Sequence, residues 1–316
     1  MLAIKNILLL LDKELDNQNA LQRAMQICKE QQANLFISSY TYNHACEEGS
    51  LRDLALRHDL KALLLEQTQQ WAEALLNEFY LPKDTPLSIC WRKHAYQAVI
   101  DNSEELSFDL VIKSSAKHHG IVDRVLHHQD WNLLKFCPAP LLLVKEKLAW
   151  ESRNIVAAVD ATSLDDAHTV INEHIFEFSE LININNNYQV HLANSYPMMS
   201  LTLASLPDTP IPEDLQQYVV NQHQDACEAI ANRYNIPAQN MHIREGEPDE
   251  VITRTAEELD ADVILVGVIS QGDVQSIILG STVEQVLDST ICDVLAIKLQ
   301  DGVRNLSEEE DGIKQA

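Results

Sequence analysis

Lys5-Asn6-Ile7-Leu8-Leu9-Leu10-Leu11-Asp12 returns 148 residues later as Arg153-Asn154-Ile155-Val156-Ala157-Ala158-Val159-Asp160. Each segment is an apolar run that ends on an aspartate, and such a run is typical of a β-strand covered on both faces of a parallel sheet. A second block repeats at a constant spacing of 153 residues, with Asp109-Leu110-Val111-Ile112 on Asp262-Val263-Ile264-Leu265. The chain therefore contains two copies of one unit of about 150 residues.

Short apolar runs alternate with amphipathic helical patterns in both copies. In the first we expect strands at 6–11, 34–40, 87–92, 110–113 and 141–145, and helices at 17–29, 50–80 (capped by Ser50), 96–106 and 130–136. In the second we expect strands at 155–159, 189–194, 241–244, 263–266 and 294–298, and helices at 164–178, 213–234, 249–259 and 281–289. This order predicts an α/β fold with two tandem open parallel five-stranded sheets.

The duplication also predicts the domain organisation. We expect a first repeat at residues 1–147, a second repeat at 153–300 and a flexible acidic tail at 301–316. The connection between the repeats is too short for a flexible tether, so we expect them to pack against each other.

Charge is distributed very unevenly along the chain. Residues 1–150 carry 16 Lys+Arg and 19 Asp+Glu, whereas residues 151–316 carry 7 and 29. A strongly acidic half repels phosphate backbones and anionic membranes, so we expect neither a nucleic acid nor a membrane as partner. No apolar run reaches the roughly 18–20 residues that span a bilayer. Six cysteines without CxxC or zinc-like spacing predict buried thiols in a reducing cytoplasm.

Candidate binding residues follow the strands. In open α/β sheets, ligands bind beyond the carboxyl ends of the strands, and Asp12 and Asp160 follow the first strand of each repeat. In the second repeat, Gly267-Val268-Ile269-Ser270-Gln271-Gly272 follows the fourth strand, and Gly280-Ser281-Thr282 opens a helix. Glycines let a backbone approach phosphates, and a helix N-terminus offers free N–H groups, so these residues predict an anion cradle. The alternative interpretation is that Gly267 and Gly280 form tight turns and Ser281 is a plain N-cap.

Together with the duplication, these residues resemble the universal stress protein family. Its nucleotide-binding members carry Gly, two residues, Gly, nine residues and Gly-Ser or Gly-Thr after the fourth strand. Here Gly267 and Gly280-Ser281 match, and Ser270 replaces the middle glycine with Gly272 nearby. The segment Cys292-Asp293-Val294-Leu295 also looks like this family, and the resemblance covers nearly the whole chain. It implies that ATP binding in the second repeat would use Asp160, Gly267, Ser270, Gly280 and Ser281.

The first repeat departs from this pattern. At the spacing of 153, Lys117 falls on Ser270, and His127 and His128 fall on Gly280 and Ser281. We therefore expect no standard nucleotide site there. A different anionic or amphiphilic ligand, held by Asp12, Lys117, Arg124, His127 and His128, remains open. Adjacent histidines usually point apart, so we expect no metal site.

The resemblance also concerns the sheet edges. In this family the last strand lies at the edge and pairs two domains; here it runs from Leu141 to Lys145 and from Val294 to Lys298. An exposed apolar edge invites aggregation, so we predict that these two edges pair within one chain as an intrachain pseudo-dimer. A further homodimer is left open.

No Gly-x-Ser-x-Gly elbow and no Walker lysine motif occurs in the sequence, which does not support a metabolic enzyme. The resemblance implies a stress-response protein that contributes to stress survival, including resistance to DNA-damaging agents. It would act by ligand sensing or partner binding, without a catalytic reaction or a required cofactor. The alternatives are an ATP-binding switch or slow ATPase that uses the second repeat, and a carrier of an amphiphilic or anionic small molecule.

Overall fold

The computed structural model describes residues 3–15, 17–47, 53–115, 124–147, 149–163, 165–183, 187–198, 214–269 and 281–298. The elements of the first repeat are β1 (Asn6–Leu11), α1 (Asn19–Gln31), β2 (Asn34–Thr41), η1 (His44–Cys46), α2 (Leu54–Glu78), β3 (Leu87–Trp91), α3 (Ala95–Glu105), β4 (Leu110–Ser114), α4 (Arg124–Phe136) and β5 (Leu141–Val144). Those of the second repeat are β6 (Asn154–Ala158), α5 (Asp166–Asn183), β7 (Gln189–Tyr196), α7 (Leu215–Arg233), η3 (Ala238–Asn240), β8 (Met241–Glu245), α8 (Pro248–Glu258), β9 (Val263–Val268), α9 (Ser281–Ser289) and β10 (Asp293–Lys298).

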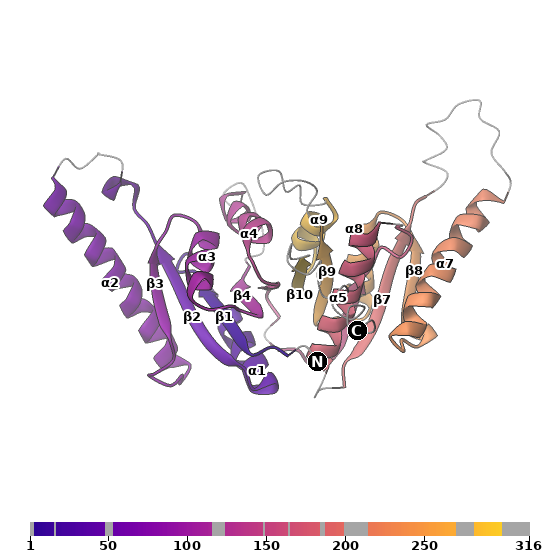
Figure 1. Ribbon diagram of the computed structural model, residues 1–316, viewed down its shortest axis with the longest axis horizontal. Coiled ribbons are helices and arrows are strands. Elements are labelled where there is room, and N and C mark those ends of the chain that lie inside the picture. The colour runs from indigo at the N-terminus through magenta and orange to yellow at the C-terminus, as the bar shows by residue number, and fades with distance from the viewer. Residues whose placement is uncertain are drawn as a thin grey trace, which may run out of the picture.

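The strands of the described part of the chain form a single ten-stranded sheet, in the order β3-β2-β1-β4-β5-β10-β9-β6-β7-β8 (Figure 1). Within the described residues, neighbouring strands are parallel in each repeat, and only β5 and β10 pair antiparallel. Buried residues of α1, α2, α5 and α7 cover one face of the sheet, and those of α3, α4, α8 and α9 cover the other. The predicted α/β class and the two parallel five-stranded units are confirmed, and the two units are continuous.

The junction between the repeats has pseudo-two-fold symmetry. Leu295 pairs with Leu142, its own counterpart at the spacing of 153, and Val294 pairs with Leu143. The predicted intrachain pairing of these edges is thus confirmed. The two strand-end lysines cross the junction reciprocally, because Lys145 Nζ donates to the Leu287 carbonyl of α9 at 2.8 Å and Lys298 Nζ donates to the Cys137 carbonyl after α4 at 3.1 Å. Both lysines lie near the C-terminal ends of helices, where the partial negative charge of the helix dipole stabilises a cation.

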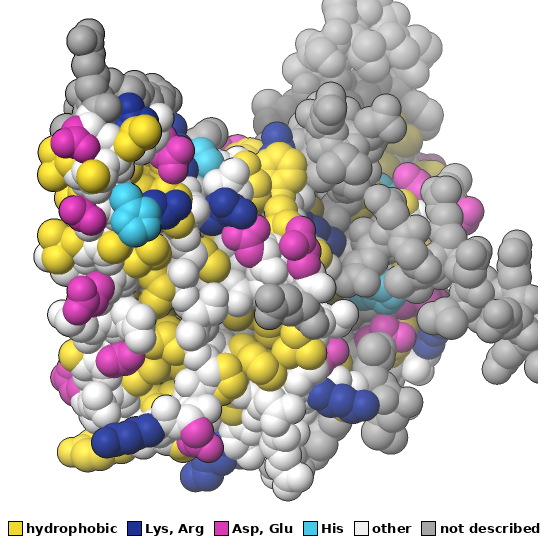
Figure 2. All heavy atoms as spheres, turned by 60° about the vertical axis from the view of Figure 1, so that its left-hand side comes forward, with side chains coloured by type: hydrophobic (Ala, Val, Ile, Leu, Met, Phe, Trp, Pro, Cys, Tyr) yellow, Lys and Arg dark blue, Asp and Glu magenta, His cyan; other side chains and the backbone are white. Residues whose placement is uncertain are grey.

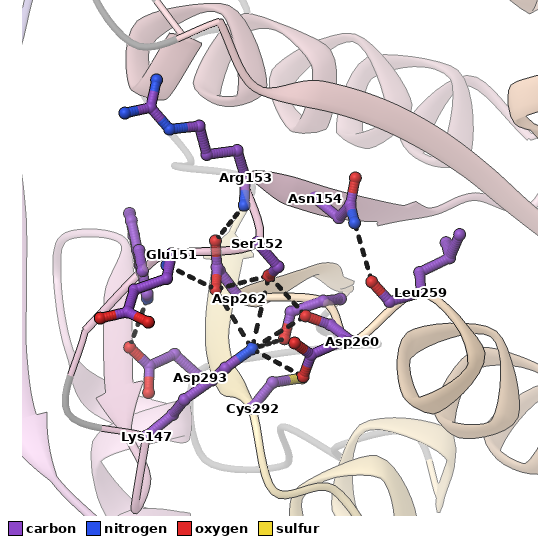
Figure 3. Close-up of polar contacts among 12 residues, drawn as sticks. Lys147, Glu151, Ser152, Arg153, Asn154, Leu259, Asp260, Asp262, Cys292 and Asp293 are labelled. Atoms are coloured by element: carbon purple, nitrogen blue, oxygen red, sulfur yellow. Dashed lines mark hydrogen bonds and ion pairs between the residues drawn. The ribbon is translucent and has the colours of Figure 1, made fainter.

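Two buried aspartates hold the connection between the repeats (Figure 3). Asp262 accepts hydrogen bonds from the backbone N–H of Arg153 at 2.7 Å and from Ser152 Oγ at 2.8 Å. Its counterpart Asp109 accepts from the backbone of Lys5 and Asn6 at 2.8 and 2.9 Å, so the repeated aspartate anchors the first strand of each repeat.

The second aspartate of the connection, Asp293, joins both repeats. Its Oδ2 lies 2.8 Å from Arg23 Nε on α1 and 2.9 Å from Trp150 Nε1, and its Oδ1 accepts from the Lys145 backbone at 2.9 Å. The side chains of Arg23 and Asp293 are fully buried, and the Arg23 guanidinium stacks over the Trp150 ring.

The helix α2 differs from its prediction. It begins at Leu54, with Asp53 as N-cap accepting from the backbone of Ala55 and Leu56, whereas Ser50 lies outside the described residues. Its apolar residues do not form one buried face, since Leu76 is buried but Leu63 is exposed along with Leu54 and Leu56. The flank of the first repeat that comes forward in Figure 2 accordingly shows hydrophobic side chains among charged ones. Helix propensity therefore predicts that a helix forms here, but it does not predict which side of the helix is buried.

Two smaller predictions also need correction. The helix expected at 130–136 begins earlier, at Arg124. Four of the six cysteines are buried, as expected, but Cys28 and Cys90 are only half-buried, and all six are free thiols.

A pair of histidines is hydrogen-bonded on β7 and β8. His191 Nδ1 lies 3.0 Å from His242 Nε2, and His191 Nε2 lies 3.3 Å from Asn154 Oδ1. Burial, and then the charge of His242, lowers the pKa of His191 to about 4. Burial and the charge of nearby Arg244 lower the pKa of His242 as well.

We expect this pair to make the protein less stable in mild acid. Histidines of the unfolded chain have a pKa near 6.5, above the folded pKa of His191, so between these two values the unfolded state binds more protons. The free energy of unfolding is therefore at its full value at pH 7 and falls as the pH drops from 6.5 toward 4. Urea unfolding at pH 7 and at pH 4.5 measures this change. Between these two pH values the wild type should lose about 2 kcal/mol more of its free energy of unfolding than His191→Gln, whose glutamine side chain does not titrate. Parallel pH dependences of the two proteins would contradict this expectation.

Candidate functional site

A cleft of about 530 Å³ opens at the carboxyl ends of the strands in the second repeat. It is lined by the end of β6, by β7 and β9 on either side of β6, and by the first turns of α8 and α9. Chain order reverses at this point of the sheet, because β7 follows β6 on one side and β9 lies on the other. The cleft therefore occupies the position where open α/β sheets bind their ligands.

Asp160 stands at the rim of the cleft with its side chain about half exposed, at 51%. Its Oδ1 accepts from the backbone N–H groups of Thr162 and Ser163 at 3.3 and 3.2 Å, which fixes the carboxylate in a turn. Its Oδ2 lies 3.7 Å from His168 Nε2. A carboxylate oxygen has two lone-pair directions, so Oδ2 can still accept a hydrogen bond from a ligand.

The backbone of Gly267 also lines the cleft, and packing explains why this residue is glycine. A Cβ at this position would lie 2.6 Å from Ile171 Cγ1 on α5, closer than carbon atoms approach without rearrangement. The interpretation of Gly267 as part of a cradle and its interpretation as a structural glycine are thus compatible. The missing side chain lets α5 approach β9 and leaves backbone at the cleft wall.

Sequence reasoning missed several residues of the cleft. Gly246 has a φ of +141°, which favours glycine, and it precedes Pro248 at the start of α8. Asn194 is buried at the end of β7, donates to the Val159 carbonyl at 2.9 Å and contacts His223 Nδ1 at 2.8 Å. Two features of the sequence could have identified these residues. One is the glycine-x-proline step between a strand and a helix, and the other is an asparagine at the end of a strand.

The other residues predicted for this site are described only in part. Thr282 lines the cleft, and Ser281 begins α9, although its side chain is outside the description. Ser270, Gly272 and Gly280 lie outside the described residues. The structure thus brings Asp160, Gly267 and Thr282 together around one cleft.

The first repeat has a buried charge network at the equivalent place. Lys113 Nζ lies 3.0 Å from Asp130 Oδ1 and 3.5 Å from Asp12 Oδ2, and the Tyr40 hydroxyl donates to Asp12 at 2.8 Å. Burial alone would lower the pKa of Lys113, but the carboxylates of Asp130 and Asp12 raise it. At the spacing of 153, Lys113 and Asp130 correspond to Val266 and Val283, which line the cleft of the second repeat. The first repeat therefore has a pair of charged side chains at the positions that form part of the apolar wall of the cleft in the second.

This network bears on the ligand site predicted for the first repeat. Asp12 is 3% exposed, and its carboxylate is contacted by Lys113 and Tyr40. Arg124, His127 and His128 lie on α4 with side chains outside the description, and Lys117 lies outside the described residues. Within the described ranges, no three His, Cys, Asp or Glu side chains gather to hold a metal ion.

The comparison with protein families decides the assignment. The model of the universal stress protein family matches residues 3–145 and 151–298, once for each repeat. The chain belongs to the universal stress protein family. Tandem universal stress domains joined through one sheet thus account for the duplication, the topology and the position of the cleft.

Similar proteins span the whole tandem arrangement. Universal stress protein E of Photorhabdus laumondii is 28% identical over 93% of this chain and 95% of its own length, and that of Escherichia coli is 28% identical over 93% and 94%. A solved structure of a functionally unknown Pseudomonas aeruginosa protein shares 25% identity with a TM-score of 0.68, over 98% of each chain. A universal stress protein from Archaeoglobus fulgidus, at 16% identity and a TM-score of 0.60 over 94% of this chain and 97% of its own, shares the fold.

None of the helices in the described part of this chain is long and apolar enough to cross a membrane.

Proposed function

We propose that this chain is a ligand-sensing universal stress protein whose second repeat binds an adenine nucleoside or nucleotide. In this proposal it contributes to stress survival, including resistance to DNA-damaging agents, and carries out no defined reaction. The first repeat serves as a ligand-free structural partner that completes the shared sheet.

One observation carries this proposal: the two repeats differ at equivalent positions. In the second repeat Val266 and Val283 line a cleft of about 530 Å³, a size within the range of small-molecule sites. In the first repeat Lys113 and Asp130 stand at these positions and pair with each other at 3.0 Å. An apolar wall, a rim carboxylate at Asp160 and the first turn of α9 offer a base surface, a hydrogen-bond acceptor and free N–H groups.

Analysis of the purified protein for bound ligand tests the proposal. Heat denaturation followed by mass spectrometry of the supernatant should release an adenine compound, and calorimetry on the emptied protein should show one site per chain. Conversion of ATP to ADP in the same sample would identify the switch or slow ATPase instead. Calorimetry without binding of any adenine compound would contradict the proposal.

The physiological part needs a separate test in cells. A strain that lacks the gene should survive a DNA-damaging agent less well than its parent, and the intact gene should restore survival. A variant that cannot bind the ligand, such as Val266→Lys described in the Discussion, should restore survival only in part if ligand sensing carries the function. Full rescue by this variant would separate survival from the cleft.

A further inference from the structure

We propose that the outer face of helix α2 is a docking surface for a basic amphipathic helix of a partner protein. The outer face is the side of α2 turned away from the sheet, where an apolar row formed by Leu56 and Leu63 runs beside an acidic row formed by Asp59, Glu66 and Glu73. It lies at the end of the molecule formed by the first repeat (Figure 1), so the proposal goes beyond the proposed function and does not rest on it.

The apolar row is not explained by the packing of α2 on the sheet. The helix buries Thr68, Ala72 and Leu76, which are four residues apart and therefore share one side. Each residue of an α-helix turns by about 100°, so Leu63, five positions before Thr68, lies about 140° around the helix from it. Leu56 lies two turns before Leu63 on the same line, and these two side chains are 51% and 48% exposed. Further burial of this row requires another molecule.

The acidic row runs parallel to the leucines. Asp59 and Glu66 follow Leu56 and Leu63 by three positions, which makes each a neighbour of one leucine on the helix surface. Glu73 continues the row at the same spacing of seven, and all three carboxylates are exposed. A spacing of seven keeps each row on one side of the helix, as in the seam and flanks of a coiled coil.

The contacts of these carboxylates leave their charge in place. Glu66 accepts from Gln70 Nε2 at 3.1 Å and Glu73 accepts from Gln69 Nε2 at 2.8 Å, so the described partners of both are neutral amides of the same helix. Lys61 of α2 is turned elsewhere, with its Nζ 5.0 Å from the centre of an aromatic ring on β3. The outer face therefore combines an apolar row with negative charge.

The second repeat indicates that the fold does not require this pattern. At a spacing of 155 residues, the buried positions of the two long helices coincide: Thr68, Ala72 and Leu76 fall on His223, Cys227 and Ala231. Leu63 then corresponds to Tyr218, which is also exposed, but Glu66 corresponds to Asn221. The acidic row is continuous in α2 and interrupted in α7, although the second repeat carries most of the negative charge of the chain. Overall acidity therefore does not account for the row.

Charge complementarity identifies the kind of partner. A helix with an apolar row of its own can pack along Leu56 and Leu63, and Lys or Arg residues beside that row would face the carboxylates. A second copy of this chain fits poorly, because a two-fold contact between outer faces would set the same acidic rows against each other. An anionic membrane is repelled for the same reason. The surface thus fits a basic amphipathic helix.

Fluorescence anisotropy with three designed helical peptides tests this proposal on the full chain. The first peptide spans about three heptads, with leucine at positions a and d and lysine at e and g. The second carries glutamate in place of lysine, and the third is a scrambled version of the first with the same charge. We expect the first to bind at least about tenfold more tightly than either of the others. Equal binding of the scrambled peptide would show a general attraction to an acidic chain and overturn the proposal, as would no binding of the first.

Two double variants locate the binding on α2. Leu56→Gln/Leu63→Gln should weaken binding of the lysine peptide about tenfold, because glutamine has a similar helix propensity but removes the apolar row. Glu66→Gln/Glu73→Gln should weaken it by about the same factor and make it less dependent on salt. All four positions are on the solvent side of the helix, so thermal scans of both variants should match that of the wild type.

The matched control lies on another helix. Glu250→Gln/Glu257→Gln on α8 removes two exposed carboxylates at the same spacing of seven, and it should leave binding unchanged. An equal effect of this control and of the α2 charge variant would overturn the proposal. Gel filtration adds a separate outcome, since a wild-type dimer that Leu56→Gln/Leu63→Gln dissociates would show that a second copy covers the face, and this also would overturn it.

Discussion

Val266→Lys should close the cleft of the second repeat and weaken ligand binding on the order of a hundredfold. The first repeat already carries a lysine at the equivalent position, Lys113, and its ammonium group contacts Asp12 and Asp130. In the second repeat the new ammonium group would reach toward Asp160, the counterpart of Asp12, across the space that the ligand needs. Calorimetry with adenosine, and a thermal scan of the free protein, measure the two consequences.

The control for this variant separates closure from unfolding. Val266→Lys alone places a lysine at a buried position without its second carboxylate, so it also costs stability. Val266→Lys/Val283→Asp restores the counterpart of Asp130, and it should regain stability while binding remains weak. Ligand affinity like that of the wild type in the folded double variant would show that the cleft is not the binding site.

Asp293→Asn should lower the free energy of unfolding by about 3–5 kcal/mol, the usual cost of breaking a buried ion pair on one side. The change leaves the fully buried Arg23 guanidinium without its charge partner and weakens the hydrogen bonds from Trp150 and the Lys145 backbone. Because these groups belong to the first repeat and the connection, the loss falls on the contact between the repeats. Urea unfolding followed by circular dichroism measures it.

A neighbouring aspartate supplies the matched control. Asp260 pairs with Lys147 at 3.0 Å in the same connection, but its side chain is 76% exposed (Figure 3). Asp260→Asn should therefore change stability by less than about 1 kcal/mol. Arg23→Met/Asp293→Asn should be less destabilised than Asp293→Asn alone, because no unpaired charge remains buried. Equal effects of Asp260→Asn and Asp293→Asn would refute the role assigned to the buried pair.

Local sequence patterns predicted the strands of both repeats closely, because a buried parallel strand is a short apolar run between polar turns. The helix α2 shows where such patterns fail. The helix was predicted from its leucine-rich pattern, which does not tell that Leu76 is buried and Leu63 is exposed. Which side of a leucine-rich helix is buried depends on the neighbouring elements, and intrinsic propensity does not encode them.

The candidate site was predictable to a similar degree. Asp160, Gly267 and Thr282 were predicted from the strand ends and the glycine pattern, and all three lie at the cleft. Asn194 and Gly246 were missed because each is an ordinary strand-end residue until the sheet places β7 beside β6 and β8 beside β7. The pairing of Asp12 with Lys113 was not predicted, since Lys113 lies 101 positions along the chain.

The order of residues along the chain is enough to identify a duplicated α/β protein with a glycine pattern in one repeat only. These features depend on runs of neighbouring residues and on a constant spacing between the repeats, both of which can be seen in the sequence. The pairing of Lys113 with Asp130, and of Arg23 with Asp293 across 270 positions, arises only when the chain folds. Both depend on buried charges that come together when the sheet forms, and the stability of a buried charge depends on partners that no local pattern specifies.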